Sequence, residues 1–227
     1  MSDVRDADVE SHVQRLRRLD CCAVSDALDQ RGEAGVVSGL LHRSGPYRIA
    51  GRVVTVRLGM GNPPPGPKMH LGCAAIEKSG VNDVLVIEQR TGIDCGAWGG
   101  LLSLAAKRRG IAGVIADGPV RDVDEALAME FAIFSRALTA RTARGRIVEL
   151  GTDLPVKIGD VAVRSGDFVI ADRSGVAFIR VESLAPVLEA AERIAAREST
   201  MAQAILSGSP VSEVMGTPYE HMLKNEP

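Results

Sequence analysis

A stretch near the middle of the chain holds residues whose types and spacing could bind an organic acid. Gly99 and Gly100 stand where a helix is predicted to begin, and their backbone N–H groups can approach a ligand because no side chain covers them. The start of a helix carries N–H groups without acceptors and a partial positive charge, which suit a carboxylate or a phosphate. Arg121 and Asp122 follow further along the chain. Together these residues indicate a site for a small anion.

Arg121 and Asp122 could do complementary work at such a site. A guanidinium can bind a carboxylate through two parallel hydrogen bonds. A carboxylate can hold a hard divalent cation directly or through water, and a single aspartate leaves the rest of the shell to water and substrate oxygens. Sequence alone leaves a plainer interpretation open, in which the two residues form a surface ion pair at a helix N-terminus and Gly99-Gly100 is a helix–sheet packing contact.

An alternation of strands and helices surrounds these residues. Strands are predicted over 83–89, 112–117 and from 131 onward, and helices over 101–110 and 120–130. Their short connections argue for crossover units and a mainly parallel layer, and hence for an α/β fold.

A turn predicted at 117–119 would deliver Arg121 and Asp122 to one edge of that layer. In a parallel layer, this edge also carries the helix start at 99–102, and it is the edge at which open α/β sheets bind ligands. We therefore expect the amides of 99–102 and the Arg121-Asp122 pair to face one cleft.

The rest of the chain is predicted to complete a single domain over residues 1–227. An N-terminal helical segment covers residues 1–32, where Val9, Val13, Leu16 and Leu19 recur at helical spacing. The remaining predicted elements are a second helix at 23–31, a strand at 49–58, a proline-rich loop at 59–67 and a helix at 69–79.

The last third of the chain changes character. Short strands separated by Gly-Asp and Ser-Gly turns predict a β-rich layer over residues 155–180. A long helix with an apolar stripe follows at 183–206, and an irregular tail is predicted after it. Helix and tail form a C-terminal segment over 183–227.

Composition narrows the classes of partner. The 27 basic and 29 acidic residues give a net charge of -2, and aromatic residues make up 3% of the chain, which disfavours nucleic acid. The first ten residues are acidic, and no apolar run approaches the roughly 20 residues that span a bilayer, so we expect neither a signal peptide nor a membrane partner. Four scattered cysteines outside any Cys-x-x-Cys pair indicate reduced thiols and a cytoplasmic location.

Ordered motifs accompany the two groups of candidate residues. They are Trp98-Gly99-Gly100-Leu101-Leu102, Ala105-Ala106, Arg109-Gly110, Gly113-Val114 and Asp117-Gly118-Pro119-Val120-Arg121-Asp122, with weaker matches at Val24-Ser25-Asp26-Ala27-Leu28 and Gly159-Asp160-Val161. Arg121 follows Gly99 by 22 positions. On these motifs the chain resembles the RraA-like family (regulator of ribonuclease activity A), which includes divalent-metal-dependent 4-hydroxy-4-methyl-2-oxoglutarate aldolases.

The resemblance implies a fold and a set of site residues. The fold is a three-layer β/β/α sandwich with parallel crossover units and a β-rich C-terminal layer. Asp122 would hold Mg²⁺ or Mn²⁺, and Arg121 and Asp122 would be the catalytic residues. The implied binding residues for a small 2-oxo acid are Gly99, Gly100, Leu101, Leu102 and Arg121.

The resemblance also implies a homo-oligomer, a trimer or a hexamer, with sites near subunit boundaries. Some aldolases of the family add an acidic residue from the C-terminal helix of a neighbouring subunit. Glu198 is the candidate by position, and Glu192 is the alternative.

Two functions of different class follow from the resemblance. One is a class II pyruvate aldolase, a lyase that cleaves 4-hydroxy-4-methyl-2-oxoglutarate or a similar 4-hydroxy-2-oxo acid by retro-aldol chemistry, with accompanying oxaloacetate decarboxylase activity. The alternative is a non-catalytic regulatory module of the ribonuclease-inhibitor type that binds a protein. A methyltransferase is disfavoured because no glycine-rich cofactor loop follows the first strand.

Several further residues are weaker candidates. The proline-rich loop departs from the family, and Asn62 or Lys68 is the candidate to supply its missing substrate contact. His70 follows this loop near the expected cleft, and Asp94 could support a metal shell. Lys107 is predicted to be solvated, which disfavours Schiff-base chemistry.

Overall fold

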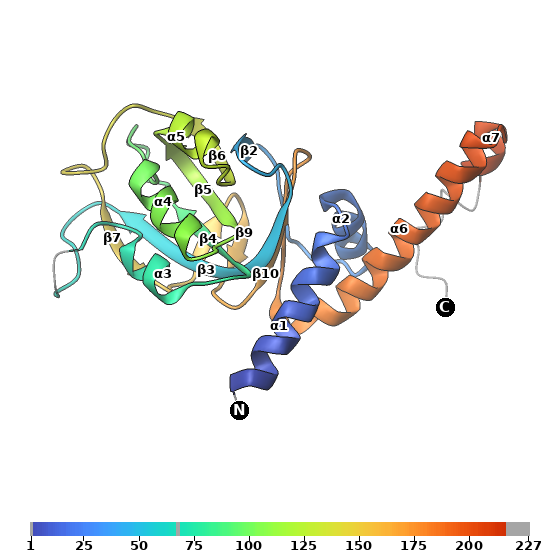
Figure 1. The fold of residues 1–227 in the computed structure, drawn as a ribbon, viewed down its shortest axis with the longest axis horizontal. Helices are drawn as coiled ribbons and strands as arrows, with labels where there is room; N and C mark the ends of the chain where they lie inside the picture. Colours follow the sequence, from blue (N-terminus) through green and yellow to red (C-terminus); the bar gives the residue numbers. More distant parts are fainter. Residues whose placement is uncertain (1, 67–68, 217–227) are drawn as a thin grey trace.

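Figure 1 shows the computed structural model of the chain, which describes residues 2–66 and 69–216. Its helices are α1 (Ser2–Arg17), α2 (Cys21–Gln30), α3 (Cys73–Lys78), α4 (Gly100–Arg108), α5 (Val123–Ala128), α6 (Leu184–Leu206) and α7 (Val211–Val214), with a 3₁₀ turn at Val181–Ser183. Its strands are β1 (Val36–Val37), β2 (Leu41–Ser44), β3 (Ile49–Gly59), β4 (Asp83–Glu88), β5 (Gly113–Val120), β6 (Ile133–Leu138), β7 (Val148–Thr152), β8 (Val156–Ile158), β9 (Val161–Val163), β10 (Phe168–Ala171) and β11 (Val176–Ile179).

The predicted crossover units form the centre of the molecule. Strands β3, β4, β5 and β6 are parallel neighbours, and α3, α4 and α5 connect them in turn. These helices lie together on one side of the sheet (Figure 1). They pack there over Leu85, Ile87 and Val114, all fully buried. The parallel layer predicted from the sequence is confirmed.

Strand β3 joins the parallel layer to an antiparallel one. Its first residues pair with β10, its middle with β4, and its end with β7, so one strand serves three neighbours. The full strand order is β1-β11-β10-β3-β4-β5-β6-β2, with β7 beside β3. Residues Ile49–Gly59 are mostly β-branched or small and buried, which suits a strand covered on both faces.

A second β layer covers the face of the sheet opposite α3–α5. The hairpin β8–β9 packs there through Val156, Ile158 and Val163, against Val86 and Phe134 of the sheet. Helices, curled mixed sheet and hairpin stack as three layers, so the predicted β/β/α fold class is confirmed.

A separate group of helices covers the antiparallel end of the sheet. Helices α1, α2 and α6 pack against β10 and β11, and α6 runs on beyond this contact to carry α7 (Figure 1). The predicted apolar stripes of the N-terminal segment and of α6 are largely buried here, namely Val13, Leu16, Leu19, Leu184, Val187, Leu188, Ala191 and Ile194.

Several predicted boundaries were wrong. The turn expected at 117–119 is a continuation of β5, with a shift of its register against β6 between Ala116 and Pro119. The helix expected at 69–79 begins only at Cys73, because Gly72 before it has a left-handed φ of 81°. The helix expected at 120–130 is the shorter α5. The tail contains α7, and the strands β1, β2 and β7 were not predicted.

Candidate active site

The end of β5 is bound to the loop before α4 by backbone hydrogen bonds. The N–H of Ala97 donates to the carbonyl of Pro119 at 2.8 Å, and the N–H of Arg121 donates to the carbonyl of Trp98 at 3.0 Å. Gly118 allows β5 to lie this close to β4, since a Cβ there would stand 2.7 Å from the Cβ of Gln89. The continued strand, rather than a turn, therefore brings the two segments together.

Trp98 holds the loop before α4 in place. Its ring is 1% exposed and stacks on Phe131 at a centroid distance of 6.4 Å. Its Nε1–H donates to the hydroxyl of Ser103 at 2.8 Å, and that hydroxyl donates to the carbonyl of Gly99 at 3.1 Å. The N-terminus of α4 is thus held by a buried aromatic side chain and one hydroxyl group.

The close approach of Asp122 favours glycine at both positions. The N–H of Gly100 donates to Oδ2 of Asp122 at 3.0 Å. A Cβ on Gly99 would lie 2.8 Å from that same oxygen, and one on Gly100 would lie 3.2 Å from the Cβ of Asp122. Asp122 itself has a left-handed φ of 56°, a conformation that aspartate tolerates better than most residues.

The side chain of Arg121 lies across the same loop. Its Nε donates to both carboxylate oxygens of Asp122, at 3.1 and 3.2 Å. Gly96 makes room for it, because a Cβ there would stand 2.9 Å from Cγ of Arg121. Within residues 2–66 and 69–216 the terminal nitrogens of Arg121 donate no hydrogen bond, and its side chain is 35% exposed. The terminal nitrogens of Arg121 remain available to a ligand.

These groups line one pocket of about 240 Å³. The predicted residues Gly99, Gly100, Leu101, Leu102, Arg121 and Asp122 are all in its wall, so the structure brings the whole predicted set to one cavity. By helix geometry the first amides of α4 have no intrahelical acceptor, which leaves those of 101 and 102 for a ligand. Their roles in binding or catalysis stay predictions.

The opposite wall was largely missed by sequence reasoning. It consists of His70, Leu71, Thr142, Ala143 and Arg144, from the segment before α3 and the loop after β6. Only His70 had been singled out, and the irregular loop holding Arg144 carries no periodic pattern that could place it. Burial and the positive charge of Arg144 lower the pKa of His70, which favours the neutral imidazole. Two guanidinium groups against one carboxylate leave the pocket suited to an anion.

The acidic and basic candidates outside the pocket have other partners. Glu192 accepts two hydrogen bonds from Arg15, at 2.7 and 2.8 Å. Asp94 pairs with Arg141 at 3.5 Å, and Lys107 donates to a backbone carbonyl at an exposed position. Asp94 and Lys107 therefore do not line the pocket. Lys68 lies outside the described residues, and Asn62 is exposed on the proline-rich loop.

Glu198 lies on α6, beside α2 and away from the pocket of its own chain. Burial and the nearby carboxylates of Asp26 and Asp20 raise its pKa. Its contribution to the site of a neighbouring subunit stays a prediction.

The donor set fits a divalent cation that keeps most of its own water. Among the residues that the structure describes, no three or more His, Cys, Asp or Glu side chains gather as a metal site. Asp122 is the one carboxylate among the described residues of the pocket wall, so it would be the ligand from this chain, and the absent Cβ of Gly99 leaves space beside its Oδ2. Mg²⁺ commonly binds through one or two carboxylates, waters and substrate oxygens, which is the arrangement that these residues allow.

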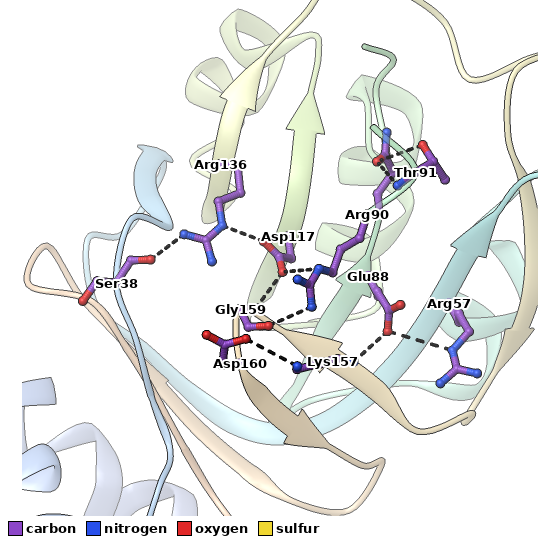
Figure 2. A network of polar contacts seen from close by, with 11 residues as sticks. Ser38, Arg57, Glu88, Arg90, Thr91, Asp117, Arg136, Lys157, Gly159 and Asp160 are labelled. Carbon is purple, nitrogen blue, oxygen red and sulfur yellow. Dashed lines mark hydrogen bonds and ion pairs between the residues drawn. The ribbon is translucent and has the colours of Figure 1, made fainter. Parts of the chain in front are cut away.

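A second polar cluster lies at β5, on the side of the sheet that the β8–β9 hairpin covers (Figure 2). The carboxylate of Asp117 is 6% exposed, and accepts from Nε of Arg136 at 2.6 Å and from the N–H of Gly159 at 2.7 Å. Arg90 approaches the same carboxylate at 4.0 Å and donates to the carbonyl of Gly159 at 2.8 Å. This cluster ties the β8–β9 turn to the sheet.

Parallel crossover units, a helix start and an Arg-Asp pair at one sheet edge define an α/β protein with a pocket whose charge suits a small anion. Residues 21–178 match the family described as RraA-like, Aldolase/RraA. The chain belongs to this RraA-like family. No helix in 2–66 or 69–216 combines the length and apolar character needed to cross a bilayer.

Individual relatives differ in name and length. A Deinococcus radiodurans protein provisionally named 4-hydroxy-4-methyl-2-oxoglutarate aldolase is 32% identical over 72% of this chain and 98% of its own. Protein DlpA of Legionella pneumophila is 28% identical over 88% of this chain, and the chain spans about a third of DlpA, 32% of its length. The structure of Streptomyces coelicolor RraAS2, described as an unusual member of the RNase ES inhibitor RraA protein family, shares the fold with a TM-score of 0.75 at 22% identity, covering 85% of this chain and 97% of its own.

Proposed function

We propose that the protein is a divalent-metal-dependent lyase that cleaves a 4-hydroxy-2-oxo acid, such as 4-hydroxy-4-methyl-2-oxoglutarate, to release pyruvate. One observation carries the proposal: the carboxylate of Asp122, the guanidinium of Arg121 and the amides at the start of α4 line a single pocket with excess positive charge. The similarity to the Deinococcus radiodurans protein supports the same activity.

The chain's own residues bind and orient the oxo acid. The terminal nitrogens of Arg121 bind its carboxylate, and the amides of Leu101 and Leu102 donate to the same end of the molecule. When the bond between C3 and C4 breaks, negative charge develops on the 2-oxo oxygen. Fixed donors at that oxygen stabilise the transition state more than the ground state.

Asp122 supplies the ligand for the cation. A bound Mg²⁺ or Mn²⁺ would supply Lewis-acid stabilisation of the charge on the 2-oxo oxygen. Asp122 is held for this task by Gly100 and by the adjacent Arg121, which fix the direction of its oxygens.

Oxaloacetate decarboxylation offers the simplest test. Loss of CO₂ from oxaloacetate develops the same charge on the 2-oxo oxygen, and no hydroxyl proton has to be removed. Pyruvate release from oxaloacetate and from 4-hydroxy-4-methyl-2-oxoglutarate should therefore be measured with Mg²⁺, with excess EDTA, and after Mg²⁺ is restored, each against a blank without protein. We expect activity that EDTA abolishes and Mg²⁺ restores. Release at the blank rate from both substrates would refute the proposal.

A regulatory role is the alternative function, and the exposed apolar residues beside the pocket favour it. Leu101 of α4 is 81% exposed, and Leu104 of the same helix and Leu127 of α5 are about half exposed. Such a patch suits a protein contact, either with a ribonuclease or with another copy of this chain. Contact with another copy of the chain is part of our proposal. We propose that this single-domain chain forms a trimer or hexamer and is cytoplasmic. Light scattering tests the assembly, and ribonuclease inhibition without pyruvate release would favour the regulator.

A further inference from the structure

A second, larger chamber opens beside the candidate active site. Its volume is about 450 Å³, against about 240 Å³ for the pocket of Arg121 and Asp122. The two cavities share His70, Leu71, Ala143 and Arg144 in their walls. The chamber is therefore the adjoining cavity into which a ligand held at the α4 amides would extend.

The walls of this chamber, which we call the proline chamber, are mainly apolar. Pro63, Pro64 and Pro65 form one side, Ala74 of α3 lies on another, and Ile147 and Val148 complete it. A lining of this kind favours carbon chains over water because it removes apolar surface from solvent.

The chamber is also preorganised. Proline fixes φ, so three consecutive prolines form a wall with few conformations to lose on binding. On the opposite side the carboxylate of Glu149 accepts from the N–H of Gly72 at 2.7 Å and from the hydroxyl of Thr152 at 2.7 Å. This carboxylate ties the start of α3 to β7, and its hydrogen-bonding capacity is partly used by the chain itself.

We propose that the proline chamber binds an apolar chain carried on C4 of the substrate. The inference rests on the proposed function and extends its substrate class to 4-hydroxy-2-oxo acids with a hydrophobic group of several carbons on C4, where 4-hydroxy-4-methyl-2-oxoglutarate carries a methyl group and a carboxylate. In the reaction the C3–C4 bond breaks, the hydroxyl proton leaves to a base, and C4 becomes the carbonyl carbon of an apolar aldehyde or ketone. The electron pair passes to the pyruvate enolate, which takes up a proton from water at C3.

A series of substrates tests the inference by turnover. We expect kcat/KM for 4-hydroxy-2-oxo acids with methyl, propyl, pentyl and heptyl groups on C4 to rise roughly two- to fourfold per methylene until the chamber is filled. Equal values along the series would overturn the inference, while release of pyruvate from oxaloacetate would leave the proposed function standing.

A bulky side chain that fills the proline chamber should remove the preference for longer groups on C4. Ala74→Phe places a ring in the chamber without touching the pocket of Arg121 and Asp122, and Ala74→Leu is the milder variant if the first does not fold. The matched control is Ala202→Phe, at an exposed position of α6. We expect Ala74→Phe to lower kcat/KM at least tenfold for the heptyl substrate and to leave oxaloacetate decarboxylation unchanged. An equal loss on every substrate would contradict the assignment.

Binding separates the inference from the chemistry. N-alkyl oxamates mimic the 2-oxo acid end and carry chains of chosen length, and calorimetry with Mg²⁺ measures their affinity without turnover. Tighter binding with chain length in the wild type, lost in Ala74→Phe, would support the chamber even if no pyruvate is released. Affinity independent of length, as expected if a second copy of the chain covers the chamber, would overturn it.

Discussion

Two Arg–Asp pairs near the end of β5 have opposite properties. Asp117 of β5 pairs with Arg136 of β6, and Arg121 and Asp122 follow the last residue of β5. Asp117 of β5 is 6% exposed and its oxygens accept from Arg136 and Gly159, at 2.6 and 2.7 Å. Asp122, five positions later, is 31% exposed, and its hydrogen bonds at 3.0–3.2 Å come from Gly100 and from the arginine next to it in sequence.

The difference lies in what remains free. The carboxylate of Asp117 is 6% exposed and is surrounded by chain segments that it holds together. The carboxylate of Asp122 opens into a pocket and keeps acceptor capacity, and Arg121 keeps its terminal nitrogens. An Arg–Asp ion pair by itself is therefore weak information about function. The exposure of the carboxylate and the number of hydrogen bonds that it already accepts decide whether the pair supports the fold or can bind a ligand.

The largest expected effect separates the two carboxylates by activity. Asp122→Asn keeps the size and the tolerance for left-handed φ but loses the charge that would hold a divalent cation. We expect Mg²⁺-dependent pyruvate release from oxaloacetate to fall more than about 100-fold, the loss typical when one transition-state contact is removed. Asp124→Asn, exposed in the first turn of α5, is the control and should retain activity. Full Mg²⁺-dependent activity of Asp122→Asn would remove Asp122 from the site.

The second prediction concerns stability. Asp117→Ala removes the buried carboxylate and leaves Arg136 with the carbonyl of Ser38 as its remaining partner among the described residues. Breaking a buried pair costs about 3–5 kcal/mol, and because Arg136 is 33% exposed we expect a lower value, about 2–3 kcal/mol of unfolding free energy. Urea unfolding measures it, with exposed Asp160→Ala as control. A change below about 0.5 kcal/mol would show that the cluster in Figure 2 is not stabilising.

Two glycine substitutions contrast the same two regions. Gly99→Ala places a Cβ 2.8 Å from Oδ2 of Asp122, an oxygen that can move, so we expect a roughly tenfold loss of pyruvate release with a small loss of stability. Gly118→Ala places its Cβ 2.9 Å from the backbone oxygen of Gln89, which cannot move cheaply, so we expect about 1–3 kcal/mol of destabilisation. Activity assays and urea unfolding on both variants measure this contrast. If Asp122 were not at the site, Gly99→Ala would leave pyruvate release unchanged.

Much of this arrangement could be predicted from the sequence. Hydrophobic periodicity located the crossover strands and the long C-terminal helix, because burial of one face imposes that spacing. The topology of parallel strands then brought the segment at 99–102 to Arg121 and Asp122, as the pocket confirms. Roles for these residues in catalysis stay predictions.

The failures have a common cause in tertiary contacts. Asp117-Gly118-Pro119 has the composition of a turn, yet it continues β5 because Asp117 is bound by the β8–β9 turn and Gly118 packs on Gln89. Arg144 reaches the pocket from a loop with no periodicity. The proline chamber combines residues from 63–74 and 143–151, which are separated in the sequence by β4, β5 and β6. Local pattern carries no signal for such contacts.

A third ion pair is expected to have the smallest effect on stability and activity, because it is neither buried nor beside a pocket. Arg15 and Glu192 join α1 to α6, and their side chains are 31% and 42% exposed. The hydrogen bond from Arg15 lowers the pKa of Glu192 below its ordinary value of 4.5. Partly exposed pairs contribute little, so we expect Glu192→Gln to cost about 0.5 kcal/mol at pH 7.

The pH dependence of that loss follows from the direction of the shift. A carboxyl group whose pKa is lowered by folding stabilises the folded state above its unfolded pKa, and this contribution is lost as the pH falls through the folded-state value. The difference in unfolding free energy between wild type and Glu192→Gln should therefore be constant well above the ordinary value of 4.5 and shrink as the pH falls through the lowered folded-state pKa, measured by urea unfolding across an acidic pH series. A difference of 2 kcal/mol or more would place Glu192 with Asp117 among the structural carboxylates. A loss of pyruvate release without loss of stability would instead make Glu192, and not Glu198, the acid of α6 that completes a neighbouring subunit's site.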